Sequence, residues 1–147
     1  NATFLALTPD GKTLLASLEI GDISGAPGGG LAAFRIGKGG ELTPLGAPAN
    51  VRGIYPCHVA VSPNGKWAIT SQYVGGTHSV LPLDKDGKPG AVAGFVVNDG
   101  KPGPKPAQKD GAHAHSAHFS RDGKFVVSCD LGLDQLTVYA LNDKTGS

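Results

Sequence analysis

The sequence predicts an all-β fold, a β-propeller of four-stranded antiparallel blades, of which this chain holds about three. Two observations lead to this prediction. The 147 residues include 23 glycines and 11 prolines and only 17% charged residues, a composition that favours short strands joined by turns. In addition, one pattern of a turn between two apolar runs occurs three times along the chain.

The three copies read Leu-Thr-Pro-Asp-Gly-Lys, Val-Ser-Pro-Asn-Gly-Lys and Phe-Ser-Arg-Asp-Gly-Lys. Their turn glycines are Gly11, Gly65 and Gly123, which lie 54 and then 58 residues apart. An Asp-Gly or Asn-Gly pair between alternating apolar residues is typical of a β-hairpin. An immunoglobulin-like sandwich would show no repeat of this length, so the spacing favours propeller blades.

Each turn is followed by further strand-like segments. We expect second strands at 13–19, 66–73 and 124–131, third strands at 31–36, 79–83 and 135–141, and outer strands at 41–44 and 91–97. Residues 1–147 would then form part of a single propeller domain, with blades at approximately 1–54, 55–112 and 113–147. Closed propellers need about four blades or more, so we expect the remaining blades of the same propeller as partners.

Two segments do not fit the strand pattern. The loop from Gly21 to Gly30 is expected to be too flexible to form an element of its own. The proline-rich segment 100–109 is expected to be an extended surface crossover between blades, with peptide binding or substrate covering as the alternative. Cys57 and Cys129 lie in apolar strand-like runs and are predicted to be buried free thiols.

The charge pattern argues against several classes of partner. The net charge is +1 and the lysines are dispersed, so no nucleic-acid partner is expected. No apolar run reaches the roughly 18 residues that a membrane span needs, and no membrane partner is expected. The glycines at 25–30 are not followed by a lysine and a helix, as a phosphate loop would be, and no cofactor is expected. A cytoplasmic location is expected, with the periplasm or secretion left open because the N-terminus of the protein is expected to be missing.

Titratable residues gather at one end of the expected strands. In a blade, the start of the first strand and the end of the second lie at the same rim, because neighbouring strands are antiparallel. This rim would collect Glu19, Gln72 and the candidate substrate-binding residues His58, Tyr73, His113 and Asp130. Such a concentration of titratable side chains is typical of a functional site.

The segment 111–118 carries three histidines. A strand period of two places His113 and His115 on one face and His118 on the other. A His-x-His pair can bind zinc or copper, but no third ligand is evident nearby, and no metal site is predicted. The alternative for His113 and His118 is hydrogen bonding to backbone carbonyls between blades. His115 corresponds to Cys57 in the second copy and suits a general base at the rim. Ser116 is a poor nucleophile candidate because adjacent strand residues face opposite ways.

Five segments together resemble a known family. They are Tyr55-Pro56-Cys57-His58, Ser71-Gln72-Tyr73, the Gly-Pro-x-Pro connection, Gly111-Ala112-His113-Ala114-His115-Ser116 and Asp130-Leu131-Gly132-Leu133-Asp134. In this order and spacing the chain resembles the seven-bladed propeller lactonases, which include 6-phosphogluconolactonases and are similar to the carboxy-muconate lactonising enzyme. The resemblance covers the whole chain and implies about three of seven blades.

The resemblance also implies a function. The parent protein would be a carboxylic ester hydrolase that opens a sugar lactone, a small molecule, with His115 as the catalytic residue that assists water at the channel rim. An arginine and a glutamate on a later blade would act with it, so this chain alone is expected to be inactive. The alternative is a propeller that binds without catalysis, because the fold does not determine the function.

Overall fold

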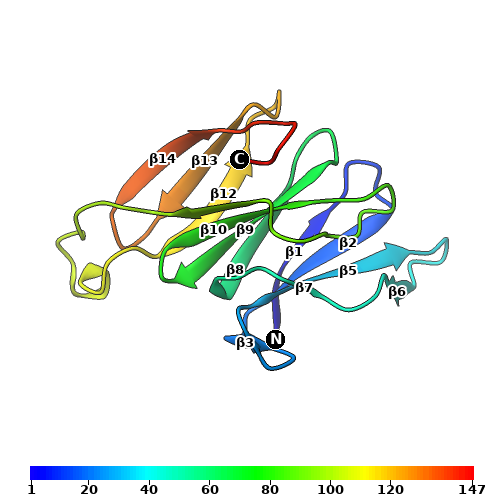
Figure 1. Ribbon diagram of the computed structural model, residues 1–147, viewed down its shortest axis with the longest axis horizontal. Coiled ribbons are helices and arrows are strands. Elements are labelled where there is room, and N and C mark those ends of the chain that lie inside the picture. The colour runs from blue at the N-terminus through cyan, green and yellow to red at the C-terminus, as the bar shows by residue number, and fades with distance from the viewer.

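The computed structural model describes all 147 residues and shows three large antiparallel β-sheets that lie side by side (Figure 1), together with one two-stranded sheet. Each large sheet is one blade, and its first strand in sequence lies at one edge of the sheet. The prediction of an all-β partial propeller is confirmed. Blade 1 consists of β1 (Ala2–Leu7), β2 (Thr13–Leu18), β5 (Gly30–Ile36) and β6 (Leu42–Pro44), with β7 (Ala49–Asn50) also paired to β5.

Blades 2 and 3 repeat the same strand order. Blade 2 consists of β8 (Ile54–Val61), β9 (Trp67–Val74), β10 (Thr77–Pro82) and β11 (Gly94–Val97), so its outer strand is shorter than the sequence predicted. Blade 3 consists of three strands, β12 (Ala114–Phe119), β13 (Phe125–Asp130) and β14 (Gln135–Ala140). No helix of the structure is long and apolar enough to span a membrane.

The turn between the first and second strand of every blade has the same hydrogen bonds. In each turn a side-chain oxygen at the Asp or Asn position accepts from a preceding hydroxyl and from the backbone N–H two residues later. The glycine that follows has a positive φ, +69° at Gly11 and +72° at Gly65 and Gly123, which L-residues with a side chain rarely adopt. The three predicted hairpin turns are confirmed.

Apolar side chains join the blades to one another. Between blades 1 and 2, a core forms around residues with no exposed surface, among them Leu15, Leu31 and Leu81. Between blades 2 and 3, a second core contains Trp67 and Ala117 together with Ile69, Val80 and Val126. Burial of these side chains away from water holds the sheets face to face and sets the rims of the three blades side by side.

Several local expectations are wrong. The loop 21–30 is not featureless, because β3 (Asp22–Ile23) and β4 (Ala26–Pro27) pair in it as a short hairpin. Asp22 stabilises this hairpin by accepting a hydrogen bond from the backbone of Gly25. Cys57 and Cys129 are free thiols, but they are half-buried rather than buried. Cys57 lies near the start of β8, and Cys129 lies in β13 (Phe125–Asp130) on the sheet that forms one end of the row of blades.

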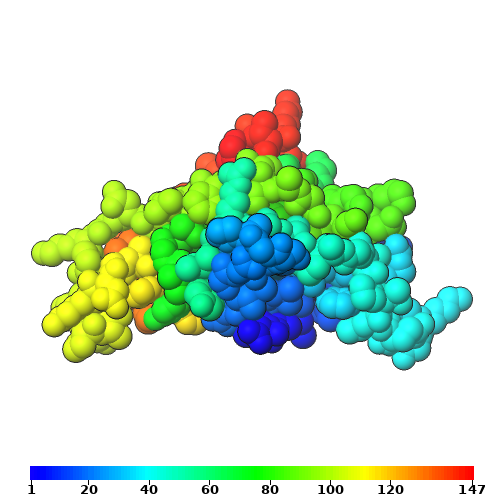
Figure 2. Space-filling model, turned by 60° about the horizontal axis from the view of Figure 1, so that its bottom comes forward, coloured from blue at the N-terminus to red at the C-terminus, as the bar shows by residue number.

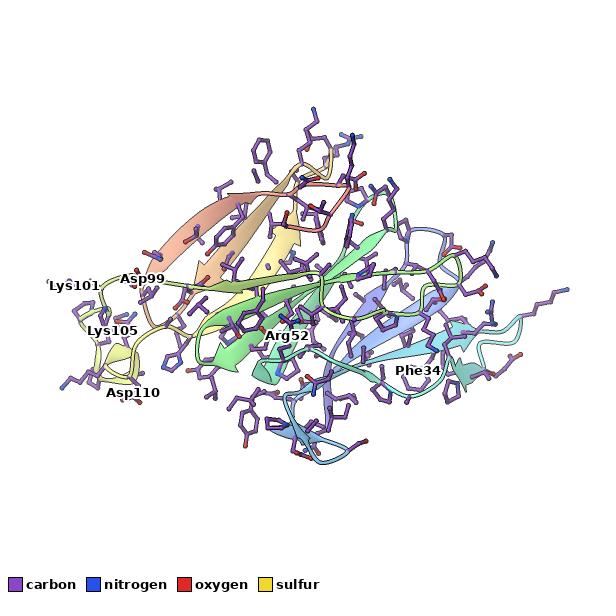
Figure 3. The ribbon with its side chains drawn as sticks, in the orientation of Figure 1. Phe34, Arg52, Asp99, Lys101, Lys105 and Asp110 are labelled. Carbon is purple, nitrogen blue, oxygen red and sulfur yellow. The ribbon has the colours of Figure 1, made fainter.

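In the connection 98–113, the expectation of an extended segment over 100–109 is wrong for most of that range. The chain bends at Gly100 and at 104–105, forms one turn of 3₁₀ helix, η1 (Pro106–Gln108), and continues into a turn at 109–110. Gln108 is buried and donates from Nε2 to the carbonyl of Leu131, which ties the connection to blade 3. In Figure 2 the connection, in yellow-green, projects at the left edge of the molecule, and the β3–β4 hairpin, in blue, lies near the middle and faces the viewer. Lys101, Lys105 and Asp110 lie on the connection at the edge of the molecule in Figure 3, away from Arg52 near its middle.

Candidate active site

A β-bulge occurs near the start of the first strand of every blade. The pairing register shifts between Ala2 and Phe4 in β1, between Pro56 and His58 in β8, and between Ala114 and Ser116 in β12. The extra residues at these bulges are Thr3, Cys57 and His115, separated by the same intervals as the turn glycines. The structure therefore confirms that His115 is the counterpart of Cys57. A bulge redirects a side chain out of the regular pleat.

The bulge at His115 changes which way the neighbouring histidines face. One inserted residue shifts the alternation of side chains between the two faces of the strand. Two residues on opposite sides of the bulge that are five apart in the sequence therefore lie on the same face. His118 accordingly packs against His58 of blade 2, with ring centroids 4.8 Å apart, while His113 and His115 lie against Tyr73 of the same blade. The expectation that His118 faces away from His113 is wrong, because strict alternation ignores the bulge.

Tyr73 stands between two of the predicted site histidines. Its ring stacks on His113 with centroids 4.5 Å apart and an interplanar angle of 6°, and it meets His115 edge-on at 5.8 Å. The Nδ1 atom of His113 lies 3.1 Å from the backbone carbonyl oxygen of Tyr73. A carbonyl oxygen only accepts, so Nδ1 of His113 carries a proton and donates. The structure therefore brings Tyr73, His113 and His115 together as predicted.

The side chain of His115 is exposed and lines a cavity of about 450 Å³ on blade 3. The other lining residues come from β12, β13, β14 and the turn between the last two: Ser116, Cys129, Asp130, Leu131, Asp134, Gln135 and Leu136. The lining contains no lysine or arginine. The cavity thus offers the imidazole of His115, the carboxylate of Asp134 and the hydroxyl group of Ser116 to a bound molecule, but no lysine or arginine from this chain.

The thiol of Cys57 supports the bulge from the neighbouring blade. Its Sγ lies 3.6 Å from the carbonyl oxygen of Ala114 and 3.5 Å from that of His115. Burial, followed by the nearby carboxylate of Glu19, raises the pKa of the Cys57 thiol to about 11. Cys57 is therefore a protonated weak donor at neutral pH rather than a nucleophile.

His58 lies deeper than the other histidines of the rim, at 4% exposure. Its ring is packed between Phe4, at 4.3 Å, and His118, and its Nδ1 accepts from the backbone of Ala117 at 3.4 Å. Burial, together with the charges of His118 and other histidines, lowers the pKa of His58 to about 4. His58 is neutral at physiological pH and does not line the cavity; its predicted contact with substrate stays a prediction.

Asp130 is also buried, at 4% exposure, although it borders the cavity. Its Oδ1 accepts from the backbone N–H groups of His113, at 2.8 Å, and Leu133, at 3.0 Å. Its Oδ2 accepts from Nδ2 of Asn98 at 2.7 Å. Both carboxylate oxygens are engaged within the protein, and a contact of Asp130 with substrate stays a prediction. Sequence reasoning missed Asn98, and the only signal was a polar residue at the end of an alternating strand.

Gln72, expected at the rim, is fully buried inside blade 2. Its amide donates to Thr70 at 2.6 Å and accepts from Thr77 at 2.9 Å, so both ends of the amide are satisfied internally. No group of three or more histidine, cysteine or carboxylate side chains is arranged to hold a metal ion.

Comparison with known proteins agrees with this geometry. The family model described as "Lactonase, 7-bladed beta-propeller" matches residues 1–147. A 6-phosphogluconolactonase of Bacillus subtilis is 36% identical over 144 residues, which is 97% of this chain and 39% of the relative. A second 6-phosphogluconolactonase, from Formosa agariphila, is 29% identical and is covered to the same extent.

Solved structures show the same similarity. A structure from Bacteroides uniformis matches all of this chain with a TM-score of 0.87 and 28% identity, over 41% of its own length. The periplasmic gluconolactonase of Pseudomonas aeruginosa matches 95% of the chain with a TM-score of 0.81 and 27% identity, over 39% of its own length. The chain thus spans about two-fifths of the relatives that it matches. It belongs to the lactonase family of seven-bladed β-propellers.

Proposed function

We propose that the parent polypeptide hydrolyses a sugar lactone of the 6-phosphogluconolactone type. By parent polypeptide we mean the full-length natural protein that contains this chain. The observation that carries the proposal is the position of His115, exposed at a strand bulge, beside Tyr73 and at the wall of a cavity. The names of the relatives support the choice of substrate class.

In the proposed reaction His115 acts as a general base. Its neutral imidazole takes a proton from water while the water oxygen bonds to the carbonyl carbon of the lactone. The tetrahedral intermediate then collapses with cleavage of the ring C–O bond, and the imidazolium returns the proton to the departing alkoxide. The product is an open hydroxy acid. Because the cavity lining contains no cation, stabilisation of the oxyanion and of a phosphate group is assigned to the remaining blades.

The test is the rate of lactone hydrolysis by the parent polypeptide, corrected for spontaneous opening of the ring. His115→Gln should lower kcat/KM by roughly 10²- to 10⁴-fold, the usual contribution of a general base. His118→Gln is the matched control, because His118 is an exposed histidine on the same strand that does not line the cavity. Equal rates for wild type and His115→Gln would eliminate His115 as the base.

The second candidate is a propeller that binds a sugar derivative without turning it over. Two features of the cavity favour binding without catalysis. No hydrogen bond within the chain orients the His115 ring, and no cation lines the cavity wall. Calorimetry with a hydrolysis-resistant lactam analogue distinguishes the two. Binding without any hydrolysis of the lactone would select the binding protein. The cytoplasmic location stays a proposal and is tested by fractionation of the source cells.

A further inference from the structure

The ring of His113 is held in one orientation from two directions. Tyr73 contributes both the stacked ring and the carbonyl oxygen that accepts from Nδ1. On its other side the Cδ2 atom of His113 lies against Gly132, where a Cβ would collide with the ring and with the carbonyl of Gly111. The half-exposed ring leaves Nε2 without a hydrogen-bond partner inside the chain.

The backbone of His113 is fixed by a buried polar network. The Oδ1 atom of Asp130 accepts hydrogen bonds from two backbone N–H groups, those of His113 and of Leu133. Leu133 lies in the turn between β13 and β14. Asn98, itself 5% exposed, donates to the other oxygen of Asp130 and accepts from the hydroxyl of Tyr139 at 2.7 Å. A carboxylate with three donors and only 4% exposure is held in one place, and so is the backbone that it binds.

We propose that Asp130 and Asn98 form a positioning pair that holds His113 with an unprotonated Nε2 directed to the rim, where it accepts a hydrogen bond from a hydroxyl group of the ligand. The inference rests on the proposed function only for the identity of that ligand. An imidazole nitrogen with a free lone pair needs a donor, so it selects a hydroxyl rather than a carboxylate or a phosphate oxygen. His113 is then a specificity residue, distinct from the base at His115.

The first test is the tautomer of His113, read from the ¹⁵N shifts of labelled histidine in the parent polypeptide at pH 7.5. The wild-type ring should be the Nδ1–H tautomer, identified by the signal that disappears in His113→Asn. In Asp130→Ala the N–H of His113 loses its acceptor, and the signal should move toward the Nε2–H tautomer that free imidazole side chains prefer. Asp134→Asn is the control, because Asp134 is an exposed carboxylate in the same turn.

Each outcome of this measurement decides the inference. A wild-type Nε2–H tautomer, or a folded Asp130→Ala variant with unchanged His113 shifts, overturns it. If Asp130→Ala does not fold, Asn98→Ala takes its place, because Asp130 keeps its bonds to His113 and Leu133 there and loses only one donor. A smaller shift in the same direction is then expected, and no shift counts against the positioning pair.

The second test separates His113 from the catalytic step. His113→Asn keeps a donor at the position of Nδ1 but has no atom at Nε2, whereas His113→Gln keeps an amide near Nε2. For a hydroxylated lactone, His113→Asn should raise KM about 3- to 10-fold with kcat nearly unchanged, which corresponds to one neutral hydrogen bond. His113→Gln should recover part of this loss. An unchanged KM in His113→Asn overturns the inference, whereas a wild type without hydrolysis refutes only the proposed function and leaves the tautomer test intact.

Discussion

Two buried histidines should make the stability of this fold depend on pH between about pH 7 and pH 4. His58 is 4% exposed and His78 is 2% exposed, and burial is the largest cause that lowers the pKa of each ring to about 4 from an ordinary value of 6.5. His78 binds the hydroxyl of Ser128 through Nε2, while its Nδ1 has no partner. Both rings are therefore buried in the neutral form.

The direction in which stability changes with pH depends on whether the folded or the unfolded state binds more protons. Below pH 6.5 the unfolded chain protonates both rings, whereas the folded state stays neutral until about pH 4. Stability is therefore complete above about pH 7 and falls as the pH decreases. For one ring the loss at pH 5 is about 2 kcal/mol, and it approaches about 3 kcal/mol near pH 4.

The assay is urea unfolding of the parent polypeptide at pH 7.5 and pH 5.0, for wild type and for a His58→Asn, His78→Gln double variant. Asn keeps an acceptor near Nδ1 of His58, and Gln keeps an amide near Nε2 of His78, so the hydrogen bonds to Ala117 and Ser128 can be retained. Other groups titrate equally in both proteins and cancel in the comparison. The wild type should lose about 3 to 4 kcal/mol more than the variant between the two pH values. Equal losses would refute the assignment of neutral buried rings.

Three further predictions concern packing and reactivity in the parent polypeptide. Leu81→Ala should lower the free energy of unfolding by about 3 kcal/mol, because Leu81 has no exposed surface, whereas Leu42→Ala, at a side chain 49% exposed, should cost under about 1 kcal/mol; similar urea midpoints would contradict this. Gly76→Ala should reduce thermal stability by several degrees, since φ is +58° and a Cβ would meet Ala112 across the blade interface; an unchanged Tm in calorimetry would count against the contact. In a Cys129→Ser variant, Cys57 should react with iodoacetamide at pH 8 about 100-fold more slowly than a free thiol, because its pKa is about 11; labelling at the free-thiol rate, measured by mass spectrometry, would disprove the raised pKa.

The fold could be predicted from the sequence because its main signal is local and repeated. The Asp-Gly and Asn-Gly turns at Gly11, Gly65 and Gly123 mark hairpins through backbone conformation alone, and their spacing implies one sheet per repeat. The β3–β4 hairpin could not be predicted in this way. Its two-residue strands carry no periodicity, and they are held by contacts such as the bond from Gly28 to Gly21.

The site could be predicted only in part, because its members meet through tertiary geometry. Antiparallel pairing placed Tyr73 near His113 and His115, and the structure shows these contacts. Strand periodicity failed at His118, since a bulge adds a residue that the sequence pattern does not reveal. Strand periodicity also could not reveal which side chains are buried. His58 is buried away from the cavity wall, and both carboxylate oxygens of Asp130 accept hydrogen bonds inside the protein.

The bulges at Thr3, Cys57 and His115 give each blade one residue that is free of the sheet's own pairing rules. A residue in a regular ladder must suit its cross-strand neighbour, but an inserted residue has none, so its side chain can change without altering the register of the sheet. Successive blades can therefore place different chemistry at equivalent points, here a hydroxyl, a thiol and an imidazole. New specificity in such a protein can arise from single substitutions at these points, one blade at a time, while the scaffold stays the same.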